Sequence, residues 1–188
     1  MSGTTSHVGE RATYREYAAW PDDGKRYEIL DGVVSAMSAP TRPHQEVAAQ
    51  LWRELDRQFS TSNAGRAWIA PLDVVFGEDT VLQPDVIAVR SERLEIARTE
   101  AVFGAPDFVA EILSPSTSPR DSLDKRLVYE RHGVREYWIL DPSARVLWQL
   151  ALANGVLSEV DRFENDAEVE SRAFPGLRVN LASVWPRS

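Results

Sequence analysis

Two acidic residues stand in segments of the chain that are otherwise apolar. Asp85 opens the segment at residues 84–89, and Glu111 lies within the apolar segment at residues 108–113. A carboxylate in a buried strand is costly unless it is paired or coordinates a metal. Two such acids on adjacent strands would offer the oxygen ligands that Mg²⁺ prefers, with waters and substrate phosphate completing the shell. We therefore interpret Asp85 and Glu111 as candidate metal ligands.

Lys125 is the candidate partner of these acids. It falls in the next expected helix, on the same side as Tyr129 one turn later. A lysine beside a metal could hold an attacking water or neutralise charge that develops at phosphorus. A structural interpretation stays open for each residue: Glu111 could pair with an arginine, Asp85 could follow a proline turn, and Lys125 could pair with Asp121 at i, i+4 for only ~0.3–0.5 kcal/mol.

The elements that must position these residues follow from the apolar pattern. Asp31-Gly32 between two apolar runs predicts a hairpin. Apolar residues at helical spacing predict an amphipathic helix over residues 43–59. The full expectation is helices at 13–20, 43–59 and 118–132, and strands at 26–30, 33–37, 66–76, 84–89, 107–113, 136–140, 145–152 and 157–163. This pattern predicts an α/β (α+β-like) fold, a mixed sheet flanked by helices. We expect one domain over residues 13–188 after a flexible tail at 1–12.

Composition narrows the class of protein. The chain has 188 residues, no cysteine and a net charge of −8. The absence of cysteine excludes disulfides, thiolate zinc sites and cysteine nucleophiles. The acidic balance argues against a protein that coats nucleic acid non-specifically, because such binding depends on Lys and Arg. No apolar run reaches the ~20 residues of a membrane span, and no secretory signal is evident, so we expect a cytoplasmic protein without membrane contact.

An ordered series of motifs resembles the Uma-two family, whose members are described as restriction endonucleases with a PD-(D/E)XK core. The motifs are RYEILDG (26–32), PTRPH (40–44), QPDV (83–86), AEILSPST (110–117), DSLDKRLVY (121–129) and GVREYWILDP (133–142). The resemblance implies a restriction-endonuclease-like fold and metal-dependent phosphodiester hydrolysis. On that pattern Asp85 and Glu111 match the metal-binding acids, and Glu28 matches an additional N-terminal acid. The superfamily's lysine position holds Leu113, so the resemblance implies that Lys125 supplies the ammonium from the helix.

Further residues are candidates for contacting substrate or supporting the metal ligands: His44, Asp73, Asp121 and Tyr129. Three of them, and Glu28, also have a structural interpretation. His44 falls near the start of a helix, where polar residues are common. Asp121 fits the acidic first turn of a helix, and Tyr129 fits packing at the edge of the core. Glu28 could be a solvated acid on a hairpin.

The function that these residues favour is a Mg²⁺- or Mn²⁺-dependent endonuclease acting on DNA, and a homodimer would allow both strands of a duplex to be cut. The alternative is a catalytically weak or inactive member that binds nucleic acid or protein. Paired carboxylates also hydrolyse glycosidic bonds, but a lysine on the next helix has no role in that chemistry. A serine hydrolase is disfavoured, because no Gly-x-Ser-x-Gly motif occurs.

Overall fold

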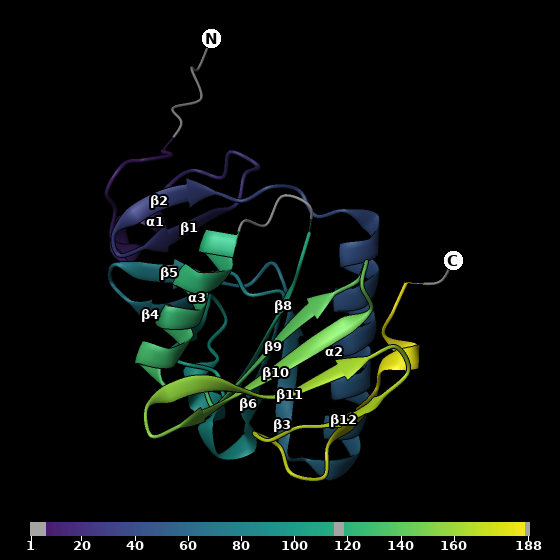
Figure 1. The fold of residues 1–188 in the computed structure, drawn as a ribbon. Coiled ribbons are helices and arrows are strands. Elements are labelled where there is room, and N and C mark those ends of the chain that lie inside the picture. Colours follow the sequence, from purple (N-terminus) through teal and green to yellow (C-terminus); the bar gives the residue numbers. More distant parts are fainter. Residues whose placement is uncertain (1–6, 115–118, 187–188) are drawn as a thin grey trace.

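The computed structural model describes residues 7–114 and 119–186 and, within the latter range, the side chains from 122 onward. Two large sheets and a small one make up most of the chain (Figure 1). The helices are α1 (Tyr14–Tyr17), α2 (Arg42–Ser62) and α3 (Pro119–His132), with 3-10 turns at Ser91–Ile96 and Leu181–Ser183. The mixed α/β class expected from the sequence is confirmed. None of the described helices is both long and apolar enough to span a lipid bilayer.

The six-stranded sheet carries Glu111 in its interior. Its order is β11 (Val156–Glu164), β10 (Val146–Ala153), β9 (Glu136–Asp141), β8 (Phe108–Ile112), β6 (Val86–Arg90) and β3 (Gly65–Ile69). Neighbours are antiparallel except β8 and β9, which run parallel and are connected through α3. A parallel pair needs such a crossover. The crossover helix therefore returns across the sheet beside the strand that holds Glu111.

The five-stranded sheet carries Glu28. Its order is β2 (Val33–Ala36), β1 (Tyr27–Leu30), β5 (Thr80–Leu82), β4 (Val74–Gly77) and β7 (Val102–Phe103). The hairpin expected at Asp31-Gly32 joins β1 to β2, and both turn residues have positive φ. The β-rich segment expected over residues 66–76 is two strands, β3 and β4, in different sheets. Pro71 lies between them and has no N–H to donate to a ladder, so the strand ends there.

Alternation along the strands determines which side chains meet which helix. Ala110 and Trp138 face the apolar cluster that contains Val47 and Leu51 of α2. Their neighbours Val109 and Tyr137 belong to a second cluster with Val128 and Tyr129 of α3. Because successive side chains in a strand point to opposite faces, Glu111 shares the α3 side with Val109. The two helices thus cover opposite faces of the six-stranded sheet (Figure 1).

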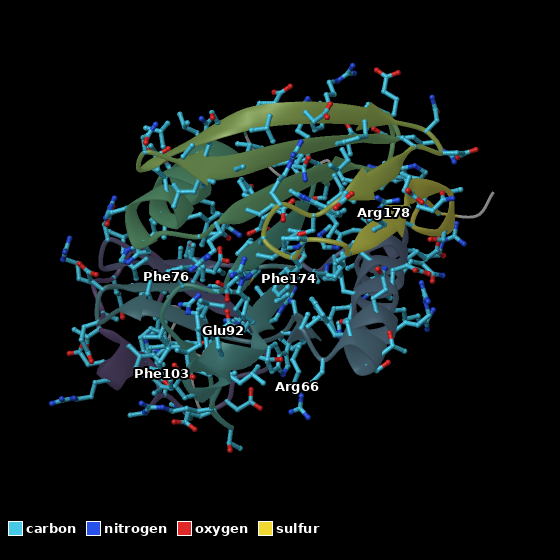
Figure 2. All side chains as sticks on the ribbon, turned by 90° about the horizontal axis from the view of Figure 1, so that it is seen from below. Arg66, Phe76, Glu92, Phe103, Phe174 and Arg178 are labelled. Carbon is cyan, nitrogen blue, oxygen red and sulfur yellow. The ribbon has the colours of Figure 1, made fainter. Side chains whose placement is uncertain are left out.

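Both ends of the described chain are packed against the fold. Residues 7–12, placed in the tail by the sequence pattern, hydrogen-bond to the β1–β2 hairpin through Gly9 N to Val34 O at 2.9 Å and Ala12 N to Gly32 O at 3.0 Å. At the other end, β12 (Glu168–Glu170) and β13 (Arg178–Asn180) form the small sheet. Phe174, labelled in Figure 2, packs against Phe59 of α2 with ring centroids 4.8 Å apart.

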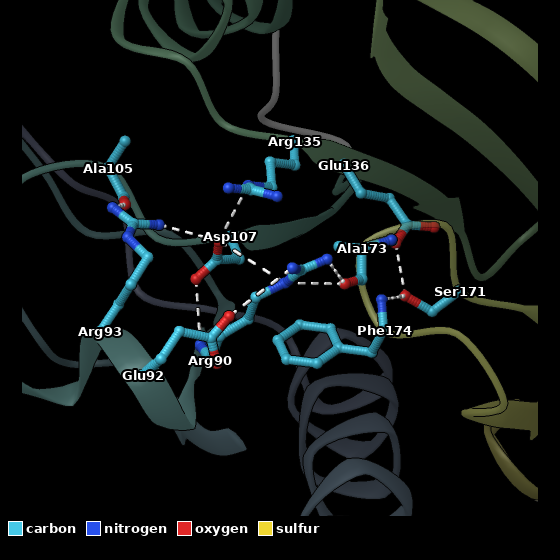
Figure 3. Close-up of polar contacts among 10 residues, drawn as sticks. All are labelled: Arg90, Glu92, Arg93, Ala105, Asp107, Arg135, Glu136, Ser171, Ala173 and Phe174. Carbon is cyan, nitrogen blue, oxygen red and sulfur yellow. Dashed lines mark hydrogen bonds and ion pairs between the residues drawn. The ribbon is translucent and has the colours of Figure 1, made fainter. Parts of the chain in front are cut away.

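Two buried acids stabilise the end of the sheet where β8 and β9 begin (Figure 3). Asp107, with no exposed surface, lies 2.8 Å from Arg93 Nη1 and 3.1 Å from Arg135 Nε. Glu136 accepts hydrogen bonds from four groups: Trp138 Nε1, Gln149 Nε2, Ser171 Oγ and the Ala173 N–H. These carboxylates are compensated by donors on several sides, as buried charges require. Their contacts join the C-terminal segment and the loop before β8 to the sheet.

Candidate active site

A cavity of about 340 Å³ opens between the β1–β2 hairpin, the start of α2 and α3. Its acidic and basic lining residues come from separate elements: Arg26 and Glu28 from the hairpin, His44 from α2, Asp85 from the start of β6, Glu111 from β8 and Lys125 from α3. Leu113, which the motif resemblance aligned with a lysine position, also lines the cavity without contributing a charge. The cavity thus collects the principal candidate residues of the sequence from five stretches of chain.

Lys125 joins two of the acids. Its Nζ lies 2.9 Å from Glu28 Oε1 and 3.3 Å from Glu111 Oε1. The lysine is buried, with 7% of its surface exposed. Lys125 therefore contacts acids of the two large sheets, which shows that its contacts extend well beyond its own helix. The side chain of Asp121, the alternative helical partner, lies outside the described part of the chain.

Asp85 is oriented by two donors. Its Oδ2 accepts the Ile112 N–H at 2.7 Å and lies 3.1 Å from His44 Nε2. His44 sits in the first turn of α2, whose N-cap Thr41 accepts the His44 N–H. Within the described residues, Nδ1 of His44 is buried without a hydrogen-bond partner. The helix start thus places an imidazole donor on one carboxylate oxygen of Asp85.

Glu111 is the most electrostatically perturbed acid of the cavity. Burial raises its pKa to about 7; the Lys125 ammonium opposes this shift, and the charges of Asp85 and Glu28 add to it. The Tyr129 hydroxyl donates to Glu111 Oε1 at 2.5 Å and favours the ionised form. Tyr129 is fully buried and packs in the apolar cluster with Val128, so its packing role is present together with the contact to Glu111. A cation bound to this carboxyl would compete with its proton.

Glu28 and Asp73 are linked through Gln83. The Gln83 N–H donates to Glu28 Oε1 at 2.9 Å, and Gln83 Nε2 donates to Asp73 Oδ1 at 2.7 Å. Tyr17 Oη lies 3.4 Å from the same Asp73 oxygen. Asp73 does not line the cavity, and burial raises its pKa. It therefore lies behind Glu28 rather than beside the reacting groups.

Some residues of the site were not singled out by the sequence pattern. Gln83 appeared only as part of the QPDV motif, yet it contacts both Glu28 and Asp73. Arg26 lines the cavity two residues before Glu28. Period-2 spacing from Glu28 was the available signal for Arg26, because residues i and i+2 of an extended chain share a side. Tyr17 carried no sequence signal beyond its place in a short helix.

The residues of the cavity fit a divalent cation. Three carboxylates, from Glu28, Asp85 and Glu111, share the cavity with one guanidinium, one ammonium and one imidazole. The surplus of negative charge and the hard oxygen donors suit Mg²⁺ or Mn²⁺, which needs only one or two carboxylates alongside waters. Across the described side chains, no three His, Asp or Glu residues converge as a ready-made metal group. A site on Asp85 and Glu111 would accordingly be completed by water and phosphate.

Comparison with known proteins identifies the family of the chain and a solved structure with the same fold. The sequence model of the Uma2 family, described as "Putative restriction endonuclease", matches residues 14–182. A solved structure from Anabaena variabilis, described as "a putative nuclease belonging to DUF820", aligns with a TM-score of 0.76 and 21% identity over 92% of this chain and 97% of that one. At this identity the likeness shows the fold alone. No protein of curated function matches. Because the family match spans most of its length, the chain belongs to the Uma2 family.

Proposed function

We propose that the protein is a metal-dependent endonuclease that hydrolyses DNA phosphodiester bonds at this cavity. The observation that carries the proposal is the meeting of Glu28, Asp85 and Glu111 with Lys125 in one cavity. These residues come from different elements, and the buried acids have a net charge that a divalent cation would neutralise. Membership of the Uma2 family, which is described as restriction endonucleases, supports the activity.

Each side chain has a part in the proposed hydrolysis. Asp85 and Glu111 would hold Mg²⁺ or Mn²⁺, which supplies Lewis-acid chemistry and lowers the pKa of bound water. The Ile112 N–H and His44 fix the orientation of Asp85. Lys125 places its ammonium where charge develops on the phosphoryl oxygens, and Glu28 holds that ammonium in place. Preorganisation of these charges in a buried site makes them effective.

Cleavage assays test the proposal directly. Supercoiled plasmid and single-stranded DNA are incubated with Mg²⁺, Mn²⁺ or EDTA, using the wild type and the isosteric Glu111→Gln variant. Cutting that needs the metal and is lost in a folded Glu111→Gln protein supports the nuclease. Equal cutting by both proteins would place the activity elsewhere. A duplex cut in both strands at one encounter would support a homodimer, which sedimentation measures independently.

A second candidate is a binding module without efficient turnover. It is favoured by Leu113, which stands where the resemblance expects a lysine, and by the net charge of −8. Calorimetry separates the two candidates. Tight Mg²⁺ or Mn²⁺ binding with no cleavage of any nucleic acid favours the module, whereas binding accompanied by turnover favours the enzyme.

A further inference from the structure

One wall of the cavity is formed by the hairpin and carries groups suited to phosphate. Arg26, Ser35 and Ser38 line this wall. The pairing of the hairpin extends past β1, because the Met37 N–H donates to Arg26 O at 2.9 Å. Arg26 and Glu28 are two residues apart on this extended chain and both line the cavity. Arg26 is half-buried and the two serines are exposed, whereas Glu28 and Asp85 are buried, so this wall forms the rim of the cavity.

Arg26 and Lys125 differ in the partners of their positively charged groups. Lys125 contacts the carboxylates of Glu28 and Glu111. Over residues 7–114 and the side chains of 122–186, Arg26 forms no ion pair; its guanidinium Nη2 donates to Ser38 O at 3.4 Å. A contact of that length is weak. The half-buried guanidinium therefore keeps most of its donor capacity for a ligand that enters the cavity.

The geometry of the Arg26 guanidinium favours phosphate as the ligand. Its planar donors match the oxygens of phosphate in a bidentate manner. Three cavity carboxylates repel an approaching phosphodiester, and the positive charge of Arg26 in the same lining offsets part of this repulsion even without metal. Arg26 stands at the rim, where it can meet a backbone phosphate without displacing Lys125 from its acids. Neutral hydroxyls beside it add donors and no further negative charge.

From this geometry we infer that Arg26 binds a backbone phosphate adjacent to the scissile one, with Ser35 and Ser38 as neighbouring donors. The inference rests on the proposed nuclease function and deepens it, since it names a residue that positions the polynucleotide. The proposed ligand of Arg26 is a phosphodiester within a strand rather than free inorganic phosphate. Arg26 is a positioning residue, so its removal affects substrate binding and leaves metal binding unchanged.

The test compares two variants with the same change of charge. Arg26→Gln removes the rim cation, and Arg66→Gln removes an exposed arginine of β3 that does not line the cavity (Figure 2). DNA binding is measured in EDTA over a range of salt concentrations, and cleavage kinetics are measured separately with metal. We expect Arg26→Gln to weaken binding about 10- to 100-fold. The slope of log K against log salt should fall by about 0.7 for a single strand or 0.9 for a duplex.

Methylphosphonate substitution then identifies the phosphate. Oligonucleotides carrying one neutral linkage at each position flanking the cut are assayed with both proteins. If the inference holds, one position weakens kcat/KM of the wild type about tenfold or more and has no added effect in Arg26→Gln. The inference would be overturned if each neutral linkage and Arg26→Gln lowered kcat/KM additively at every position. Equal losses in Arg26→Gln and Arg66→Gln would also overturn it, because a general charge effect would then suffice.

The outcomes separate this inference from the proposed function. If the wild type cleaves DNA and Arg26→Gln has the same KM and the same salt dependence of binding, the inference about Arg26 is wrong. The proposed nuclease function then still stands. If DNA binding depends on Arg26 but no DNA is cleaved, the proposed nuclease function is wrong and the phosphate contact of Arg26 still stands. Inorganic phosphate could instead bind Arg26 and inhibit cleavage, while DNA binding stays the same in the wild type and Arg26→Gln. That result would overturn the assignment of a polynucleotide phosphate as the ligand. Thermal unfolding and metal titration of each variant confirm that the fold and the acids are unaffected.

Discussion

Lys125 and Glu28 are 97 residues apart in the sequence, and their charged atoms are 2.9 Å apart in the fold. The pair joins α3 to the strand β1, and the second contact of Lys125, with Glu111, extends the link to β8. The cluster therefore contributes to stability as well as to the proposed chemistry, and the two contributions can be separated by mutation.

Replacement of Lys125 by methionine should reduce both stability and activity. It leaves two buried carboxylates without their ammonium, which costs about 3–5 kcal/mol of unfolding free energy. Loss of the positioned charge should lower kcat by about 10²–10³. In the double variant Glu28→Gln/Lys125→Met, part of the stability should return while activity stays lost. Urea denaturation and cleavage assays measure the two effects. Full recovery of activity in the double variant would show that Lys125 has only a structural role.

His44 should act on Asp85 through Nε2, and two amide variants can test this. The amide nitrogen of glutamine reaches the position of Nε2, whereas that of asparagine reaches only the position of Nδ1. His44→Asn should weaken Mg²⁺ or Mn²⁺ binding about 10- to 100-fold, the usual cost of removing a hydrogen-bond partner of a ligand. His44→Gln should retain most of the affinity. Calorimetry distinguishes them, and equal affinities would mean that the 3.1 Å contact does not orient Asp85.

The raised pKa of Glu111 predicts how stability changes with pH. The folded protein binds this proton up to about pH 7, whereas the ordinary pKa is 4.5. Without metal, the folded state therefore binds more protons than the unfolded state in this interval, and the free energy of unfolding should fall as pH rises from 4.5 through 7. Glu111→Gln should flatten this part of the profile in urea denaturation. A wild-type profile that matches the variant's would contradict the assignment.

Tyr129→Phe should raise the pKa of Glu111 further, because the hydroxyl lost in the variant favours the carboxylate. A cation competes with the proton for Glu111, so metal affinity should weaken most below pH 7 and recover as pH rises. Metal titrations at several pH values measure the shift of the midpoint. A uniform loss of affinity at every pH would indicate that Tyr129 acts only through packing.

Asp107→Asn provides a contrast away from the cavity. The change leaves Arg93 and Arg135 without their buried partner. Because both arginines stay partly exposed to solvent, we expect a loss of about 1.5–3 kcal/mol in unfolding free energy, with kcat per folded molecule unchanged. Denaturation gives the folded fraction, and cleavage at low temperature gives kcat. A fall in kcat of the folded protein would connect this end of the sheet to the reaction.

The sequence predicted the local elements better than their assembly. The Asp31-Gly32 turn, the long helix of α2 and the apolar run around Glu111 each carry a local signal, since turn chemistry and periodicity act over a few residues. The division of strands between two sheets depends on contacts distant in sequence. Residues 66–76 therefore appeared as one β-rich segment although β3 and β4 belong to different sheets.

The candidate site was predictable to a similar degree. Glu111 stood out as an acid among apolar neighbours, yet Glu136 and Asp107 are more deeply buried and drew no attention. What separates them is the identity of their partners. Glu136 meets neutral donors and Asp107 meets arginines, whereas Glu111 faces a cavity with other acids. Those partners are distant in sequence, so the composition around each acid could not reveal them.

The crossover position of α3 has a consequence for how this sequence can change. Lys125 reaches the cavity because of its rotational phase on a helix that connects the parallel strands β8 and β9. Each residue of an α-helix turns the chain by about 100°. Insertion or deletion of one residue before Lys125 would swing the ammonium away from Glu28 and Glu111, while substitutions at the exposed Leu123 and Leu127 leave its direction unchanged. Length in this stretch is therefore constrained more tightly than surface composition.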